Sequence, residues 1–170
     1  MRYFIIGFKN SGKTTFGSKL AQKLGIRFID LDEYIEHQEG KTIPQIYTAL
    51  GEEKFRTLEW QSLKKLAKTE DHVVIATGGG APCNCDNMNL MEKYGEVIYL
   101  KVPDEILVGR LLQASLSRPI VFGKSETEIR NYLADLKNRC EHHYMKATHI
   151  VEGINPEPDE LISRLGKQTG

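Results

Sequence analysis

The sequence predicts an α/β protein in which a mainly parallel sheet carries helices on both faces. Five short segments rich in Val, Ile, Phe or Tyr recur along the 170 residues, and segments with helical spacing lie between them. The first of the five is almost continuously apolar, as a strand covered on both faces should be. No linker and no internal repeat divides the chain, so a single domain is expected.

Each expected strand is a short apolar segment, and together they are residues 3–6, 27–30, 72–76, 96–101 and 149–152. The first expected helix covers residues 13–24 and ends at Gly25, a residue that suits a left-handed C-cap. Further helices are expected over residues 52–68, from an N-cap at Asp86 to Gly95, and over residues 126–145. Residues 113–124 show no clear period and contain an Arg-Pro pair and a glycine, so they are expected to form a mobile flap.

The charge balance and the apolar runs narrow the classes of function. The 23 Lys and Arg residues offset 23 Asp and Glu residues, whereas a protein that binds nucleic acid by counterion release normally has a basic surplus. No apolar run approaches the roughly 18 residues that cross a bilayer, and the N-terminal run is too short for a signal peptide. Three cysteines, an odd number, do not suggest a disulfide framework. We therefore expect a cytoplasmic monomer that binds neither nucleic acid nor membranes.

Residues 7–14 read GFKNSGKT and fit the phosphate-binding pattern G-x-x-x-x-G-K-[ST]. The pattern lies between the first strand and the first helix, where backbone N–H groups and the helix N-terminus can surround phosphate oxygens. Lys13 is expected to reach the β- and γ-phosphates of a nucleotide, and the Thr14 hydroxyl to bind magnesium. The alternative is an ordinary glycine turn at the end of a strand.

Asp30 and Asp32 follow at the end of the second expected strand, and their i, i+2 spacing on a strand predicts that both side chains point to one side. The carboxyl ends of parallel strands share an edge, so both acids should face the phosphate loop. One carboxylate could hold water on magnesium while the other orients or deprotonates an attacking hydroxyl. The alternative is a helix N-terminus capped by acids.

Arg56 and Glu59 lie three residues apart on one face of an expected helix. Such a pair is either a solvated surface contact or a carboxylate that holds the guanidinium toward a substrate carboxylate. Gly78, Gly79 and Gly80 follow the third strand at the same sheet edge. They form either a flexible loop or a place where a ligand approaches the main chain.

Two further arginines are candidates for the site. Arg139 borders the buried stripe of the last long helix, so its head group either reaches the crevice or lies at the surface. Arg118, in the expected flap, could swing over phosphates. Cys83 and Cys85, taken with the distant Cys140 and two histidines, lack the spacing of a structural zinc site. No histidine can be placed in a triad with serine or cysteine, which leaves covalent catalysis unsupported.

In their order and spacing these motifs resemble the shikimate kinase family over nearly the whole chain. The likeness is carried by the phosphate loop, the Asp-Leu-Asp run at 30–32, the stretch 51–59, the triple glycine, Arg118-Pro119 and Arg139. It implies a nucleoside-monophosphate-kinase-like fold with five parallel strands in the order 2-3-1-4-5 and a closing lid. It also implies ATP-dependent phosphorylation of the 3-hydroxyl of shikimate, giving shikimate 3-phosphate and ADP on the route to aromatic amino acids.

The resemblance further implies roles for the matching residues, with Mg²⁺ as the cofactor and ATP as co-substrate. Asp32, Lys13 and Arg118 would be catalytic, and Thr14 and, through water, Asp30 would hold the metal. The nucleotide would be bound by Asn10, Ser11, Gly12, Lys13, Thr14, Thr15, Arg110, Arg118 and Pro156. Shikimate would be bound by Asp32, Arg56, Gly78, Gly79, Gly80 and Arg139. The substrate-binding region would span about residues 32–62, and the lid about residues 113–124.

Two rival functions remain at this point. A gluconate kinase of similar fold would also need a carboxylate anchor, but the triple glycine and the Arg56–Glu59 pair match shikimate kinases better. A nucleotide-operated switch or a non-catalytic ATP-binding module is the rival of another class. A guanine-specific switch would show an Asn-Lys-x-Asp run, and the sequence contains none. Retention of both acids and all three arginines argues against a non-catalytic module.

Overall fold

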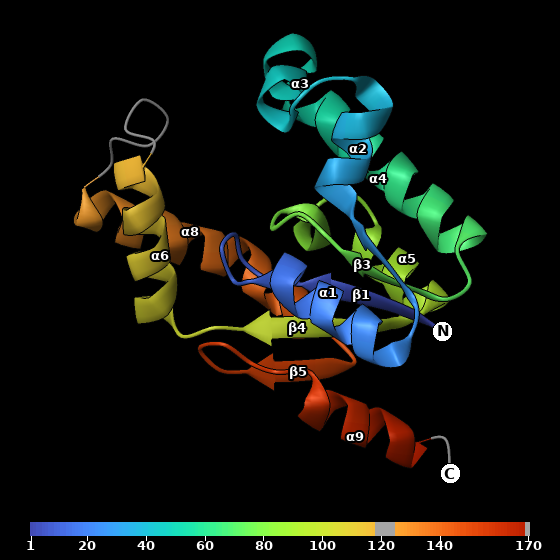
Figure 1. Ribbon diagram of the computed structural model, residues 1–170. Coiled ribbons are helices and arrows are strands. Elements are labelled where there is room, and N and C mark those ends of the chain that lie inside the picture. The colour runs from blue at the N-terminus through green and yellow to red at the C-terminus, as the bar shows by residue number, and fades with distance from the viewer. Residues whose placement is uncertain (118–124, 169–170) are drawn as a thin grey trace.

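A computed structural model describes residues 1–117 and 125–168 of the chain. Within these residues five strands form one parallel sheet in the order β2-β3-β1-β4-β5, with helices on both faces (Figure 1). The strands are β1 (Arg2–Ile6), β2 (Arg27–Asp30), β3 (Val73–Ala76), β4 (Glu96–Lys101) and β5 (His149–Glu152). The predicted α/β class and strand order are therefore confirmed.

Each strand is followed along the chain by one or more helices. They are α1 (Lys13–Leu24), α2 (Leu31–Glu39), α3 (Ile43–Leu50), α4 (Glu52–Thr69), the 3₁₀ turn η1 (Ala81–Cys83), α5 (Asn87–Tyr94), α6 (Asp104–Ser117), α8 (Glu126–Tyr144) and α9 (Asp159–Gln168). The predicted long helices over 52–68 and 126–145 agree with α4 and α8 to within one residue at their ends.

The central strand β1 separates two hydrophobic layers. Phe4 and Ile6 pack into the layer under α4, α5 and α8, whereas Tyr3 and Ile5 pack into the layer under α1 and α9. Successive side chains of a strand point to opposite faces, so a strand buried on both faces must be apolar at every position. The near-continuous apolar run in the sequence has this cause.

The expected flap at residues 113–124 begins within a helix, and its mobility stays a prediction. Helix α6 continues to Ser117, so residues 113–117 are helical rather than part of an irregular flap. The apolar positions of α6, such as Leu107, Val108 and Leu111, are buried against the α8 layer, and this packing supplies the helical order. Residues 118–124, which include Arg118, lie outside the described residues.

The parallel sheet brings three functional segments to one edge. The phosphate loop follows β1, α2 follows β2, and the triple glycine follows β3, and these strands are neighbours in the sheet. Helices α2, α3 and α4 form a projecting group beside this edge, while α6 and α8 lie on the other side (Figure 1). Ligands of open parallel sheets bind at the carboxyl ends of the strands, so this edge is where a site is expected.

Candidate active site

The phosphate loop has the backbone shape that its glycines permit. Gly7 and Gly12 have φ angles of 152° and 91°, values that side chains rarely allow, and Asn10 adopts 63°. A Cβ on Gly7 would come within 2.9 Å of the Leu100 carbonyl oxygen. The Lys13 ammonium donates to the carbonyls of Gly7 and Phe8 at 3.0 and 2.9 Å. The loop is therefore folded around its lysine at the N-terminus of α1.

A cavity of about 670 Å³ lies on one side of the phosphate loop. Its lining includes Asn10, Ser11, Thr15, Arg110 and Pro156, all of them predicted nucleotide contacts. The Ser11 hydroxyl is buried and has no hydrogen-bond partner among the described residues, so an acceptor or donor of a bound ligand could satisfy it. We refer to this space as the nucleotide cavity.

Arg110 is held in the wall of the nucleotide cavity by three acceptors. Its guanidinium donates to Asn10 O at 3.0 Å, to Ile154 O at 2.7 Å and to Asn155 Oδ1 at 3.0 Å. These contacts join the phosphate loop to the segment before Pro156. Arg110 therefore orders the two parts of the wall between which a nucleotide base and its phosphates would lie.

A second cavity of about 440 Å³ lies on the other side of the phosphate loop, and we call it the acceptor cavity. Its lining includes the predicted site residues Lys13, Thr14, Asp30, Asp32, Arg56, Gly78, Gly79 and Gly80. Asn10, Gly12 and Thr15 line both cavities, so the phosphate loop forms their common wall. A group bound in one cavity is thus placed next to a group bound in the other.

Asp30 caps α2 and also contacts the phosphate-loop helix. One carboxylate oxygen accepts from the backbone N–H groups of Asp32 and Glu33 at 3.0 and 3.2 Å, and the other accepts from the Thr14 hydroxyl at 2.7 Å. The acid-capped helix considered as an alternative is therefore present at Asp30. The strand argument for Asp32 is wrong, because β2 ends at Asp30 and Asp32 lies in the first turn of α2. Both acids nevertheless line the acceptor cavity.

Burial shifts the pKa values of Lys13 and Asp32, which both line the acceptor cavity. It lowers the pKa of Lys13 to about 8, although Asp32 and Asp30 act in the opposite direction. Burial and, next, the neighbouring Asp30 raise the pKa of Asp32 above its usual value, while Lys13 opposes this shift. A raised carboxyl pKa and a lowered lysine pKa are typical of functional sites.

Arg56 and Glu59 form an ion pair that is not a surface contact. Arg56 Nη1 lies 3.0 Å from Glu59 Oε1, and the Glu59 side chain is 1% exposed. Burial raises the pKa of Glu59, although Arg56 works against this. The solvated alternative is therefore wrong for this pair, since the guanidinium faces the acceptor cavity with its counter-ion buried behind it.

The triple glycine is packed too closely to carry side chains. A Cβ on Gly78 would lie 3.2 Å from carboxylate oxygens of Asp32 and Glu59, and one on Gly80 would lie 2.5 Å from Arg56 Nη2. A Cβ on Gly79 would lie 3.0 Å from the backbone nitrogen of Lys9. The flexible-loop alternative is therefore insufficient, because the glycines allow the main chain to approach the acids, the arginine and the phosphate loop.

Arg139 is not directed into the acceptor cavity in this structure. Its side chain is 62% exposed and pairs with Asp135, with Nη2 3.1 Å from Oδ2. Tyr132 and Leu136 of the same helix do line the cavity. Arg139 follows them at i+7 and i+3, so it lies on the same helix face even though its head group turns away.

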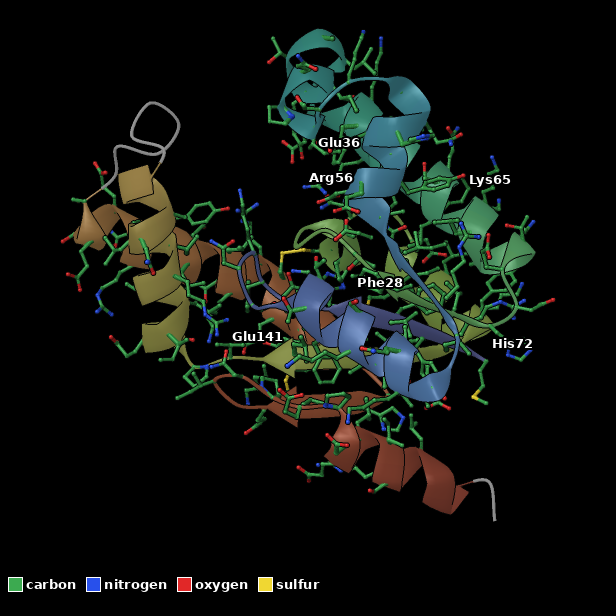
Figure 2. The ribbon with its side chains drawn as sticks, in the orientation of Figure 1. Phe28, Glu36, Arg56, Lys65, His72 and Glu141 are labelled. Atoms are coloured by element: carbon green, nitrogen blue, oxygen red, sulfur yellow. A yellow bond between two sulfur atoms is a disulfide. The ribbon has the colours of Figure 1, made fainter. Side chains whose placement is uncertain are left out.

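Sequence reasoning missed the residues that fasten the glycine loop to its surroundings. The buried Tyr144 hydroxyl donates to the Gly79 carbonyl, and Cys83 is joined to Cys140 by a disulfide. Figure 2 shows this disulfide between the segment after β3 and α8. The odd number of cysteines does not suggest a disulfide framework, yet the fold brings this pair, 57 positions apart, to a Cα separation of 5.2 Å and they form one disulfide.

In residues 1–117 and 125–168, no three His, Cys, Asp or Glu side chains cluster as a metal centre would require. No helix in those same ranges has the length and apolarity to cross a membrane.

The phosphate loop forms the common wall of two cavities. One of these cavities contains two carboxylates, an arginine paired with a buried glutamate and the main chain of three glycines. This arrangement defines a P-loop phosphotransferase that acts on a small acceptor. A family model described as shikimate kinase matches residues 9–169. The chain belongs to the shikimate kinase family. It is an enzyme that phosphorylates the 3-hydroxyl of shikimate with ATP, giving shikimate 3-phosphate and ADP on the route to aromatic amino acids.

Individual relatives agree with this assignment. The chain is 44% identical over 147 residues to a shikimate kinase of Parabacteroides distasonis, covering 86% of this chain and 84% of that protein. A crystal structure of shikimate kinase from Bacteroides thetaiotaomicron matches with a TM-score of 0.88 at 36% identity, covering 99% of this chain and 98% of that one. Shikimate kinase from Acinetobacter baumannii in complex with shikimate matches with a TM-score of 0.80 at 31% identity, covering 99% and 92%.

Proposed function

We propose that this chain binds ATP in the nucleotide cavity and shikimate in the acceptor cavity, and that the phosphoryl group passes between them along the phosphate loop. The single observation that supports this most strongly is that Asn10, Gly12 and Thr15 line both cavities. Phosphoryl transfer depends mainly on positioning and on stabilisation of charge, and a common wall supplies both. Lys13 would neutralise charge on the transferred group.

The nucleotide would be held by the residues of the shared loop and by the outer wall. Backbone N–H groups of Asn10, Ser11 and Gly12 and the side chains of Lys13, Thr14 and Thr15 would bind the phosphates. Arg110 and Pro156 would border the adenine. The proposed contact of Arg118 with the phosphates falls outside the described residues.

The Thr14 hydroxyl and the Asp30 carboxylate suit a magnesium ion. Both are hard oxygen groups, they lie 2.7 Å apart, and Asp30 keeps its other oxygen for capping α2. We propose that Thr14 binds Mg²⁺ directly and Asp30 through water. The metal would supply charge neutralisation at the ATP phosphates.

Asp32 is the proposed base or orienting group for the acceptor hydroxyl. Its partly buried carboxylate, beside Lys13 and with a raised pKa, is suited to accept a proton from a hydroxyl that becomes a nucleophile. Arg56, backed by Glu59, would hold the carboxylate of the acceptor. The main chain of Gly78, Gly79 and Gly80 would contact the rest of the acceptor.

Arg139 would join Arg56 at the shikimate carboxylate after a change of rotamer. Its place on the helix face of Tyr132 and Leu136 supports this, since the exposed pair with Asp135 is worth little in water. We further propose a single domain with a substrate-binding region at about 32–62, acting as a cytoplasmic monomer without nucleic-acid or membrane partners.

A coupled assay of ADP release tests the function. At fixed Mg-ATP, shikimate should stimulate ADP release strongly, and quinate and gluconate should do so weakly or not at all. Stimulation by gluconate alone would favour the rival kinase. ADP release that does not depend on shikimate would defeat the proposal.

A further inference from the structure

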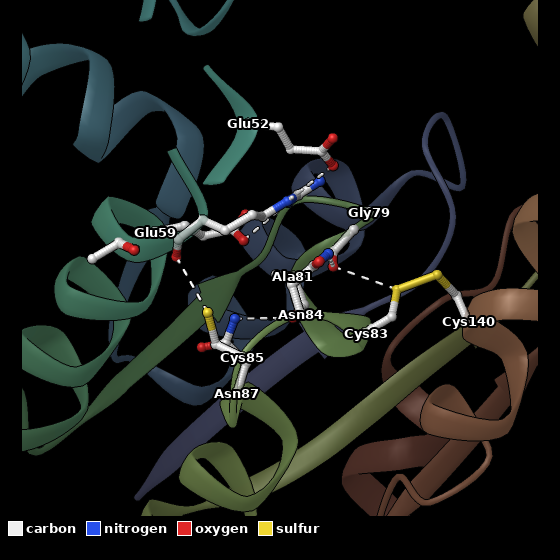
Figure 3. A network of polar contacts seen from close by, with 12 residues as sticks. Glu52, Glu59, Gly79, Ala81, Cys83, Asn84, Cys85, Asn87 and Cys140 are labelled. Carbon is white, nitrogen blue, oxygen red and sulfur yellow. Dashed lines mark hydrogen bonds and ion pairs between the residues drawn. A yellow bond between two sulfur atoms is a disulfide. The ribbon is translucent and has the colours of Figure 1, made fainter. Parts of the chain in front are cut away.

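The glycine loop of the acceptor cavity is attached to α8 at two points. The Tyr144 hydroxyl donates to the Gly79 carbonyl. Figure 3 shows the second attachment, the Cys83–Cys140 disulfide that links the end of η1 to α8. The glycine loop and α8, which are distant in sequence, are thus held together at the edge of the cavity. Tyr144 lies four residues after Cys140, so both attachments come from one face of α8.

The covalent attachment lies between two elements that are proposed to bind the same substrate group. Cys83 is three residues after Gly80, and Cys140 is the residue next to Arg139. The bond therefore limits how far the glycine loop can move from the segment of α8 that carries Arg139. Its presence or absence should change the affinity of the acceptor cavity for shikimate.

Two side-chain amides close to the loop in sequence also bind its carbonyl oxygens. Asn84 Nδ2 donates to Gly80 O at 2.6 Å, and Asn87 Nδ2 donates to Ala81 O at 2.9 Å. Such local bonds give the loop its shape but move with it as a unit. These local bonds do not set the distance between the loop and α8. Tyr144 and the disulfide limit that distance directly.

We propose that Cys83 and Cys140 are a reversible thiol–disulfide site whose disulfide form raises the affinity for shikimate. This inference rests on the proposed function for the role of the loop. Disulfides of proteins in reducing compartments are usually transient and redox-sensing. A cysteine pair at a substrate loop can therefore respond to the ratio of thiols to disulfides around the protein.

The chemistry needs a small dithiol as reductant and a small disulfide as oxidant. One thiolate of the dithiol attacks Cys83, which is partly exposed, and the S–S bond breaks to release Cys140, which is 3% exposed, as a thiolate. The second thiol of the reductant then displaces Cys83, leaving two protein thiols and a cyclic disulfide. In the reverse direction two electrons and two protons pass from the cysteines to the small disulfide, which becomes two thiols.

The closing experiment compares the protein oxidised with glutathione disulfide and reduced with dithiothreitol. Thiol counting by alkylation and mass spectrometry should give one free thiol, Cys85, in the oxidised form and three in the reduced form. Reduction should raise the KM for shikimate about fivefold or more, because the substrate must then order the loop, with kcat changed by less than about twofold. Cys83→Ser and Cys140→Ser should behave as the reduced protein in both conditions.

The exposed Cys85 provides the matched control, since Cys85→Ser should keep the full response to redox state. The inference is overturned if three thiols remain after oxidation, if KM is equal in both states, or if Cys85→Ser abolishes the response. Amide hydrogen exchange of residues 78–84 serves as a readout without substrate and should be faster after reduction. Unchanged exchange also overturns the inference, whereas absence of shikimate-dependent activity in both states defeats the proposed function instead.

Discussion

Arg56 Nη1 lies 3.0 Å from Glu59 Oε1, and the carboxylate of this pair is almost completely buried. Burial by itself lowers the pKa of an arginine, but the charge and hydrogen bond of Glu59, together with Tyr47 and Glu52, more than compensate, and the pKa of Arg56 is raised. A buried acid that lost its partner would be strongly destabilising. Glu59 therefore both requires Arg56 and fixes the direction of the guanidinium at the acceptor cavity.

Replacing Glu59 by Gln should weaken shikimate binding without unfolding the protein. Gln keeps the shape and one acceptor but removes the charge that orients Arg56, and a charge-assisted hydrogen bond contributes about 1.5 to 3 kcal/mol. We expect KM for shikimate to rise about tenfold or more, with the KM for ATP nearly unchanged. Steady-state kinetics of Glu59→Gln measures both constants.

The control for this variant is Glu52→Gln. Glu52 also faces Arg56, with 3.9 Å between Oε1 and Nε, but its side chain is 70% exposed. An exposed pair contributes little, so the KM for shikimate should stay within about twofold. Equal effects at the two positions would show that general charge, rather than orientation of Arg56, governs binding.

Gly80→Ala should displace the same guanidinium by contact. The added Cβ would lie 2.5 Å from Arg56 Nη2, while the backbone at Gly80, with φ −85°, suits alanine. The arginine must move, and we expect the KM for shikimate to rise about tenfold. Gly109→Ala is the control, because nothing lies within 4 Å of its added Cβ. A Gly80→Ala enzyme with normal KM would mean that the position of Arg56 is unimportant.

Much of the fold could be predicted because the local signals and the tertiary packing agree. The apolar runs of all five strands, the glycine-bounded phosphate loop and the buried stripe of α8 each specify one structure. The sequence offers helix α2 only as the alternative of an acid-capped helix, since its capping residue Asp30 also ends a strand. The sequence does not predict that residues 113–117 are helical, because their helical order comes from the packing of the preceding turns of α6.

The ordered set of motifs predicted the residues that line the acceptor cavity, but spacing alone does not predict how they contact one another. The phosphate loop specifies Lys13 and Thr14 by spacing, but burial decides whether Arg56 and Glu59 form a surface pair, and spacing does not show burial. The contacts of Tyr144 and Cys140 with the glycine loop join segments more than 50 residues apart. No local pattern in a single sequence identifies such a pair.

Asp32→Asn should lower kcat by about 10² to 10⁴ while the protein remains folded, because the amide cannot accept a proton from the acceptor hydroxyl. The KM for ATP should change little. Steady-state rates with circular dichroism of the variant measure both effects. Glu33→Gln, an exposed neighbour in α2, should leave kcat unchanged. A rate for Asp32→Asn within threefold of the unmodified enzyme would remove Asp32 from the chemistry.

Reduction of the Cys83–Cys140 disulfide should also lower the free energy of unfolding. The bond closes a chain segment of 57 residues, and a link of that span stabilises a fold by about 2 to 4 kcal/mol, largely by restricting the unfolded chain. The midpoint of urea unfolding should fall when reductant is added, and it should not respond to reductant in Cys83→Ser. A midpoint that is the same with and without reductant would contradict this expectation.

The affinity for ATP should fall as the pH rises through the pKa of Lys13. Burial lowers that pKa to about 8 in the free protein, whereas the negative phosphates of ATP should raise it in the complex. Above about pH 8 the free protein has lost the proton and the complex retains it, so binding takes up a proton and Kd rises by up to about tenfold per pH unit. Below that pH both states are protonated, and Kd should be level.

Titration calorimetry in two buffers with different heats of ionisation measures this proton uptake directly. At about pH 9 the observed heats should differ between the buffers, and at about pH 7 they should agree. Adenosine, which lacks the phosphates, provides the control and should bind with no pH dependence through Lys13. A Kd for ATP that is constant across this range, with no buffer-dependent heat, would show that the Lys13 ammonium is not titrated as its burial predicts.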